Sequence, residues 1–241
     1  SFNINGVGLV VTGTASAGEV KKGDLLELLP GGQSVRILHL RANNCEVDGA
    51  SAGQRVALAL AGKVSQKQIE RGDWLVTPNG PPLSQRLDVE VTLLGSAPYA
   101  LKHMAPVKLY IGAKRRAARL AHIDRTEQPL KPGESCLAQL ILDDPISGAW
   151  GEPILIQDHA ETLVLGGGKV LDPEGPKFGK SRNDRLHWLR ALQISDAKSA
   201  LTQLLHGEHT VDLSRFWRNR NYPQVPESLF PSDEVRIFER E

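Results

Sequence analysis

Three glycine-rich stretches contain residue types that could hold a nucleotide phosphate, because glycine lets backbone N–H groups approach an anion closely. Residues 175–181, Gly-Pro-Lys-Phe-Gly-Lys-Ser, come nearest to a phosphate loop, but they are one residue short and follow a polar segment instead of a buried strand. Residues 6–8 lack the third glycine of a dinucleotide fingerprint, and residues 166–169 lack the required spacing. The sequence therefore favours no nucleotide site in this chain.

The histidine and carboxylate side chains form no recognisable metal or catalytic pattern either. His206 and His209 are three residues apart, but Gly207 lies between them and no third ligand is evident, so a solvated pair is favoured. Asp143 and Asp144 precede a proline, which is typical of a turn. Because no nucleophile stands beside a base in a known motif, we predict that the chain is not an enzyme by itself and holds no cofactor or metal.

Arginine and lysine side chains offer the clearest chemistry, which is the binding of phosphate or another anion. The densest basic cluster is Lys114, Arg115, Arg116 and Arg119, and it follows a predicted strand at 107–111. Phosphate contacts from such side chains position an RNA without reading its sequence. The alternative is a solvated charged hairpin, as most such clusters are, and both interpretations stay open at this point.

Composition restricts where a nucleic acid could bind. The chain has 241 residues with 29 basic and 28 acidic side chains, so its net charge of +1 allows only a local basic patch. Aromatic residues are 5%, which argues against a surface built on stacked bases. Cys45 and Cys136 form neither a disulfide framework nor a zinc motif, and no apolar run is long enough to span a membrane. A reducing, cytoplasmic setting fits best.

Short β-type runs separated by turn residues must position these side chains. Strands are predicted at 8–13, 25–29, 35–40, 55–60 and 74–76, and we assign residues 1–80 to a first small barrel. After a Pro- and Gly-rich stretch at 78–82, further strands are predicted at 87–94, 107–111, 118–121, 135–142 and 153–156, with short ones at 164–165 and 170–171. These indicate a second barrel at 84–173.

The composition and the spacing of apolar residues change after residue 173. Residues 174–182 are rich in Gly, Pro and Lys and predict a mobile linker. From 183 to 241, apolar residues recur at helical spacing, Ser195 and Asp212 can cap helices, and 235–238 has a strand pattern. The predicted fold class is therefore mainly β, with two consecutive small β-barrels followed by a short helical, partly winged-helix-like module.

Residues 2–14, Phe-Asn-Ile-Asn-Gly-Val-Gly-Leu-Val-Val-Thr-Gly-Thr, resemble the opening of the second domain of the translational GTPases, Phe-x-Ile-x-Gly-x-Gly-x-Val-x-Thr-Gly. Residues 18–24, 52–58 and 69–75 resemble three further motifs of that domain, in the family's order. The second β series is similar to the family's third domain in placement and strand pattern. Thr14, where elongation factor Tu typically has arginine, and the helical continuation after 171 make the chain most similar to the selenocysteine-specific elongation factors.

The resemblance implies that this chain is a fragment of a longer factor. The GTPase domain would precede Ser1, so GTP and Mg²⁺ would belong to the full-length factor and this fragment would have no GTPase activity. The implied partners are selenocysteyl-tRNA, delivered at recoded UGA codons, and the ribosome, with no membrane. The selenocysteine-insertion hairpin in mRNA would be bound only by C-terminal modules that this chain does not contain.

The resemblance also places the aminoacylated end of the tRNA at residues 53–56 of the first barrel, where Gly53, Gln54 and Arg55 would line a pocket. Arg55 stands where elongation factor Tu usually has a neutral, amide-bearing residue. A selenol is largely anionic at neutral pH and a guanidinium keeps its charge, so Arg55 would favour selenocysteine over serine. The alternative is that Arg55 merely points outward from a barrel strand.

In related factors the region of Lys114, Arg115, Arg116 and Arg119 meets the T arm of the tRNA. Glycines 166–168 either allow a close approach of RNA or form a plain turn.

Two rival functions remain. The chain could carry ordinary aminoacyl-tRNA as the corresponding domains of another translational GTPase, or it could be a β-barrel interaction module without an RNA role.

Overall fold

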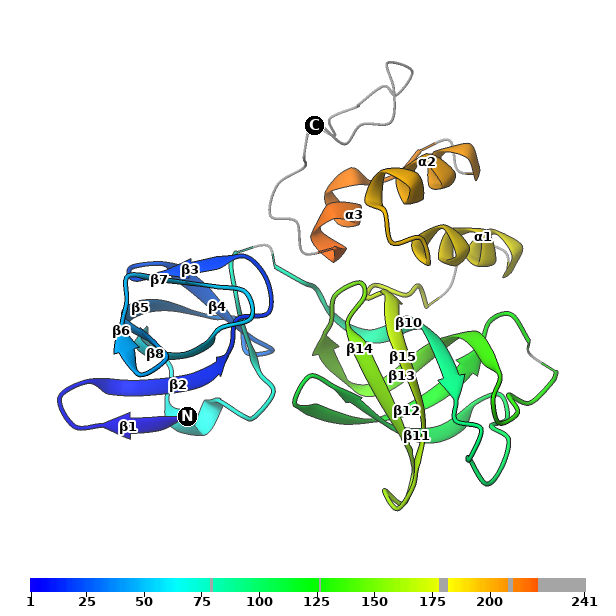
Figure 1. Ribbon diagram of the computed structural model, residues 1–241, viewed down its shortest axis with the longest axis horizontal. Helices are drawn as coiled ribbons and strands as arrows, with labels where there is room; N and C mark the ends of the chain where they lie inside the picture. The colour runs from blue at the N-terminus through cyan, green and yellow to red at the C-terminus, as the bar shows by residue number, and fades with distance from the viewer. Residues whose placement is uncertain (79, 126, 178–181, 208–209, 221–241) are drawn as a thin grey trace. The chain divides into compact units, whose positions relative to one another are not determined.

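The computed structural model describes residues 1–78, 80–125, 127–177, 182–207 and 210–220. They form two compact units, residues 1–80 and 81–241. These described residues are mainly β, and the three α-helices among them all belong to the second unit (Figure 1). Within the described residues, none of the helices has the length and apolar character that crossing a bilayer requires. The predicted strand at 235–238 lies outside the described residues.

The first unit is an antiparallel sheet with the strand order β1-β2-β8-β5-β4-β9, in which β6 also pairs with β5, and a small sheet of β3 and β7. Its core is formed by side chains such as Leu26, Ile37, Leu40 and Leu58. The strands are β1 Phe2–Ile4, β2 Gly8–Thr14, β3 Glu19–Lys21, β4 Leu25–Leu29, β5 Gln33–Ala42, β6 Cys45–Glu46, β7 Gly49–Ser51, β8 Arg55–Gly62 and β9 Trp74–Val76, with a 3-10 turn at Gln66–Gln68.

Strand β5 shows why an alternating sequence forms a strand with one buried face. Val35 and Ile37 are 1% exposed and pack in the core, whereas Arg36 between them faces solvent. The register against β8 shifts between Ile37 and His39, which is the mark of a β-bulge. The bulge leaves Leu38 39% exposed and returns Leu40 to the core, so the predicted alternation holds on both sides of the irregularity but not through it.

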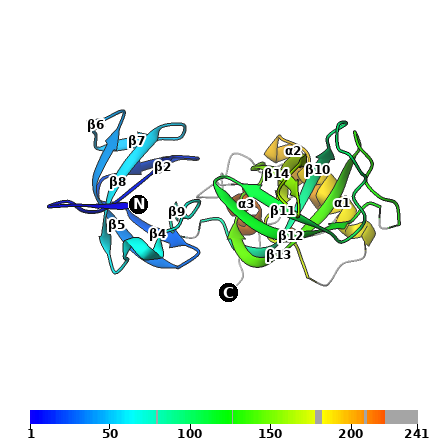
Figure 2. The same ribbon diagram turned by 90° about the horizontal axis from the view of Figure 1, so that it is seen from below.

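The second unit contains a closed antiparallel barrel with the strand order β10-β13-β12-β11-β14-β15. Its interior is filled by fully buried aliphatic side chains, among them Leu87, Leu109, Leu140 and Ile156. The three helices cover one end of this barrel (Figures 1 and 2). The strands are β10 Leu83–Leu93, β11 Ala105–Ile111, β12 Lys114–His122, β13 Ser135–Ser147, β14 Pro153–Asp158 and β15 Val164–Asp172.

The helices are α1 Arg182–Leu192, α2 Ala197–Gly207 and α3 Leu213–Asn219. As predicted, Asp212 caps α3 by accepting a hydrogen bond from the backbone N–H of Arg215. The predicted cap of α2 is wrong by one residue. Asp196, not Ser195, accepts hydrogen bonds from the N–H and the hydroxyl of Ser199, at 2.8 and 2.6 Å, since a carboxylate is the stronger acceptor for these donors.

The predicted linker is held in place where the structure describes it. The N–H of Glu174 donates to Asp172 Oδ1 at 2.9 Å, and the N–H of Gly175 donates to the carbonyl of Arg86 at 3.0 Å. Gln139 Nε2 donates to the carbonyl of Pro176 at 3.1 Å. These bonds tie residues 174–176 to the barrel. The rest of the linker, residues 178–181, lies outside the described residues, and the division of residues 84–241 into three parts stays a prediction.

Candidate nucleic-acid interface

Arg55 lies at the start of β8, on the face of the strand opposite the core. Val56, Leu58 and Leu60 are buried in the core of the first unit, so the side chains that alternate with them point outward. Arg55 is exposed and stands opposite Thr14 of β2. Within the described part of the chain its guanidinium has no hydrogen bond or ion pair. This outward direction is what the alternative without a pocket predicts, and the place of Arg55 in an aminoacyl-end pocket stays a prediction.

Gln54 and Gly53, the other two residues of the predicted pocket, have structural tasks in the turn before β8. Gly53 has a φ of +87°, a conformation that favours glycine. The side-chain oxygen of Gln54 accepts a hydrogen bond from the N–H of Ser51 at 2.6 Å, and the N–H of Gly53 donates to the carbonyl of Ala15 at 2.8 Å. These contacts fix the backbone of the turn immediately before Arg55.

The outer face beside Arg55 combines small side chains with further basic ones. Ala57, the next outward residue of β8, stands opposite Thr12 of β2 and Arg41 of β5. Arg41 Nη2 donates to the carbonyl of Asn44 at 2.6 Å. One strand position further, His39 lies 3.1 Å from Glu46, and its hydrogen bond holds the pKa of that carboxyl below its usual value. On this face the small side chain of Ala57 therefore lies beside basic side chains.

The predicted basic cluster of the second barrel lies within β12, and strand alternation divides it between two faces. Lys114 is only 5% exposed and Arg116 is partly buried. Both share the core-facing side of β12 with Leu120. Arg116 Nη1 donates to the carbonyl of Arg115 at 2.9 Å. Only Arg115 and Arg119 are exposed on the outer face.

Glu161 balances part of the positive charge on that outer face. It forms ion pairs with Arg115 and, at 3.4 Å, with Lys108 of β11. Hydrogen bonding to Tyr110 and the charge of Glu161 raise the pKa of Arg115. Arg119, opposite Pro106 of β11, has no ion pair with a described residue. Sequence reasoning missed Lys108 and Glu161, although the alternation of the strand at 107–111 placed Lys108 on the outward face.

The glycines at 166–168 lie inside β15, so the alternative of a plain turn is wrong. A Cβ at Gly168 would stand 1.8 Å from the carbonyl oxygen of Glu90 in β10, and one at Gly167 would stand 2.7 Å from that of Ile154 in β14. Neighbouring strands therefore pass too close to β15 for any side chain at these positions. Close strand packing accounts for the three glycines.

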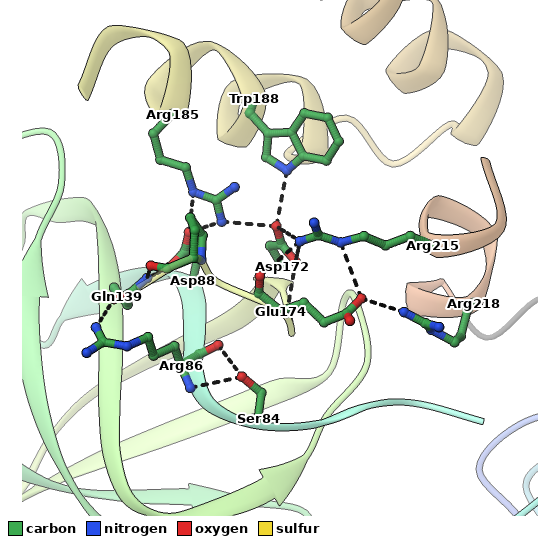
Figure 3. Close-up of polar contacts among 11 residues, drawn as sticks. Ser84, Arg86, Asp88, Gln139, Asp172, Glu174, Arg185, Trp188, Arg215 and Arg218 are labelled. Carbon is green, nitrogen blue, oxygen red and sulfur yellow. Dashed lines mark hydrogen bonds and ion pairs between the residues drawn. The ribbon is translucent and has the colours of Figure 1, made fainter. Parts of the chain in front are cut away.

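A polar network that the sequence did not indicate joins the barrel to the helices (Figure 3). Asp88 of β10 and Asp172 of β15 are 0% and 1% exposed. Arg185 of α1 pairs with both carboxylates, at 3.0 Å to Asp172. Arg215 of α3 also pairs with Asp172 at 3.0 Å. Asp88 takes a polar position of an alternating strand and Asp172 begins a polar segment, so nothing in the neighbouring sequence indicates that either carboxylate is buried with an arginine partner.

The other candidate sites remain without support from the described residues. No group of three or more His, Cys, Asp or Glu side chains among them could hold a metal ion. His206 Nδ1 is hydrogen-bonded to the carbonyl of Thr202 at 2.9 Å, and His209 lies outside the described residues. Asp143 and Asp144 lie in the extended strand β13 and not in the predicted turn. The end of the glycine-rich stretch at 175–181 is likewise outside the described residues.

Comparisons with known protein families divide the chain as the two units do. The family model "Elongation factor Tu domain 2" matches residues 8–76, in the first unit. The model "Selenocysteine-specific elongation factor, beta-barrel domain" matches residues 86–177, which cover the barrel of the second unit. The first match contains the strand of Arg55, and the second contains β12 together with Asp88 and Asp172.

Individual relatives extend the match over the helices. The selenocysteine-specific elongation factor of Haemophilus influenzae is 32% identical over 238 residues, which are 98% of this chain and 37% of the relative. That of Escherichia coli is 33% identical over 90% of this chain and 33% of the relative. A crystal structure of the bacterial selenocysteine-specific elongation factor EF-Sec, 21% identical, shares the fold over 98% of this chain and 37% of its own, with a TM-score of 0.73. The chain thus spans about a third of the length of these relatives.

Proposed function

The chain belongs to the family of selenocysteine-specific elongation factors, and from this we propose that it supplies the surfaces of such a factor that hold selenocysteyl-tRNA for delivery to the ribosome at recoded UGA codons. Arg55 would face the aminoacyl end, and the outer face of β12 would contact the T arm. The delivery takes place in the cytoplasm, where ribosomes work.

The observation that carries the proposal is the exposed guanidinium of Arg55 on the outer face of β8. A tRNA end that covers this face would exclude water from the guanidinium and from the selenolate. An ion pair that is shielded in this way is much stronger than an exposed one. Serine, whose hydroxyl stays neutral, would leave the same guanidinium covered without a counter-charge, which costs binding free energy. Discrimination between selenocysteine and serine would thus come from the negative charge of the selenolate, which serine lacks.

Replacing Arg55 with asparagine tests this role. Arg55→Asn should lower the preference for selenocysteyl-tRNA over seryl-tRNA by roughly tenfold or more, the equivalent of a charge-assisted hydrogen bond. The two affinities are measured by protection of each aminoacyl ester from hydrolysis. Arg71→Asn, which removes another exposed arginine of the same unit, is the control and should leave the preference unchanged. An unaltered preference in Arg55→Asn would favour a carrier of ordinary aminoacyl-tRNA.

The T-arm proposal is tested with the two exposed arginines of β12. Arg119→Ala and Arg115→Ala should each weaken tRNA binding and reduce the slope of log affinity against log salt by about one unit per lost phosphate contact. The effect of Arg119→Ala should be larger because Glu161 already pairs with Arg115. Lys114→Ala is the comparison on the inner side of the strand and should leave the salt slope as it is. Binding of tRNA that is independent of salt would point to an interaction module without an RNA role.

We also propose that GTP and Mg²⁺ act elsewhere in the factor and that this chain does not hydrolyse GTP by itself. Its glycine-rich stretches have identified structural tasks at the positions described, such as Gly175 against Arg86 and Gly168 against Glu90. Titration of the chain with a fluorescent GTP analogue should show no saturable binding, and saturable binding would contradict this part of the proposal.

A further inference from the structure

The polar network between the helices and the second barrel separates its charges by element. Its carboxylates all belong to the barrel side, namely Asp88 of β10, Asp172 of β15 and Glu174 immediately after β15 (Figure 3). Arg86 of β10 joins the network through Gln139. The guanidiniums that pair with the three carboxylates belong to the helices, namely Arg185 of α1 and Arg215 and Arg218 of α3. The charges of this set sum to zero, so each charged group that folding removes from water has a counter-charge.

The contacts cross-link several elements at once. Arg185 bridges Asp88 and Asp172, and Trp188 of the same helix donates to Asp172 Oδ2 at 3.2 Å. Arg215 bridges Asp172 and Glu174, at 3.0 and 3.2 Å. Arg218 completes the set with Glu174 at 2.8 Å. Because each guanidinium is planar and donates in a fixed geometry, α1 and α3 are fixed in direction as well as in distance.

A second attachment lies around Trp150, in the segment between β13 and β14. Its indole N–H donates to the carbonyl of Leu192 at the end of α1, at 2.7 Å. Its backbone N–H donates to the carbonyl of Asn219 at the end of α3, also at 2.7 Å. The guanidinium of Arg220 lies over the indole ring, 3.9 Å from its centroid. Trp150 therefore holds the C-terminal ends of both helices.

Barrel and helices also share an apolar core. Leu137 of β13 and Leu171 of β15 belong to the same buried cluster as Leu189 of α1 and Trp217 of α3. The contact between helices and barrel thus has a hydrophobic layer as well as the two polar attachments. Such a contact resembles the interior of one domain more than the surface between two mobile ones.

We propose that α1–α3 and the second barrel form one rigid arm, locked by the network of Asp88, Asp172, Glu174, Arg185, Arg215 and Arg218. A ligand that holds the helices therefore also orients the outer face of β12. The network explains why the guanidiniums of Arg215 and Arg218 are paired within the protein. This inference concerns motion within residues 81–220 and does not depend on which tRNA the chain binds.

Relaxation of backbone ¹⁵N nuclei in the whole chain tests the rigid arm. Amides of the barrel strands and of α1–α3 should fit one common rotational correlation time. A shorter correlation time for the helices in the unaltered protein would overturn the proposal. The measurement involves no tRNA, so its outcome is separate from that of the Arg55 experiment.

A series of charge-exchanging variants tests whether the ion pairs of the network hold the helices against the barrel. Glu174→Arg places a cation against Arg215 and Arg218 and should increase hydrogen exchange of α3 amides several-fold, while amides of β11 and β12 stay protected. Adding Arg218→Glu should restore protection, because the pair re-forms with its charges exchanged. Glu161→Arg, which breaks the pairs with Arg115 and Lys108, is the matched control and should leave α3 unaffected. Unchanged exchange of α3 in Glu174→Arg, or failure of the swap to restore it, would show that the charges do not lock the helices.

Discussion

Asp88 and Asp172 are both buried and both pair with Arg185, yet their pKa values shift in opposite directions. For Asp88, loss of hydration dominates over the attraction of Arg185 and raises the pKa to about 6. Burial opposes the charge of Asp172 as well, but Arg185 and Arg215 together outweigh it and hold the pKa of that carboxyl below its usual value. The difference follows from the number of partners, since Asp172 has two guanidiniums and Asp88 has one.

Asp88 should therefore make the chain less stable as the pH rises. Its folded pKa of about 6 lies above the ordinary value of 3.8 for this side chain. Its contribution to stability is therefore fully present below about pH 4 and is lost as the pH rises through 6. Asp88→Asn removes this loss. Between pH 4 and pH 7 the unfolding free energy of the variant should gain up to about 3 kcal/mol relative to the unaltered protein.

Urea unfolding at a series of pH values measures that difference. Asp143→Asn removes an exposed carboxylate of β13 and is the control, for which the difference should not depend on pH. Asp172→Asn should behave in the opposite sense. The stability contributed by Asp172 is present above its unfolded pKa and is lost as the pH falls through its lower folded value, so this variant should be less stable than the unaltered protein at pH 7. If the unfolding free energies of all three variants depended on pH in the same way, the opposite pKa shifts of Asp88 and Asp172 would be contradicted.

Among the elements, β15 depends most on the absence of side chains. It pairs with β10 on one side and β14 on the other, and the carbonyls of both neighbours approach its glycines. A barrel of six strands has little interior space, so a strand that comes this close at the wall cannot move aside without disturbing the next strand.

Gly168→Ala should for this reason destabilise the second unit severely. The new Cβ would meet the carbonyl of Glu90 at 1.8 Å, and separating the strands should cost at least about 3 kcal/mol. Gly95→Ala is the control, because nothing lies within 4 Å of its Cβ position, and it should change stability by less than about 0.5 kcal/mol. Thermal unfolding followed by circular dichroism compares the two. Equal melting temperatures would show that β15 adjusts more easily than its contacts indicate.

The same elements show what the sequence could and could not predict. Mainly β architecture with helices late in the chain is confirmed, because apolar alternation and turn residues act locally and are visible in segments such as residues 87–93. The cluster at Lys114–Arg116 was not recognised as part of a strand, because its charged side chains conceal the alternation that places Lys114 inward. The Asp88–Arg185 pair joins residues that are 97 positions apart, and no local pattern predicts such a contact. Arg55 points outward, as the alternative without a pocket predicts, and its role at the aminoacyl end stays a prediction.

For the molecule as a whole, the two units have separate hydrophobic cores. Ile37 and Leu40 belong to the core of residues 1–80, whereas Leu140 and Trp217 belong to the cores of the second unit. Each unit should then unfold by itself. Leu40→Ala should lower the stability of one transition by about 2–5 kcal/mol, and Leu140→Ala that of another. Denaturant unfolding followed by NMR signals from each unit tests this, and a single transition shifted equally by both variants would contradict it.

The ring of strands in the second unit has a consequence for self-association. Because that barrel is closed, it presents no unpaired strand edge to which a foreign strand could add. The sheet of the first unit is open and ends at β1, whose apolar Phe2 and Ile4 are 43% and 42% exposed. Fibrillar aggregation by strand addition in concentrated solutions of this chain should consequently start from β1, and a lysine placed at Ile4 should delay it.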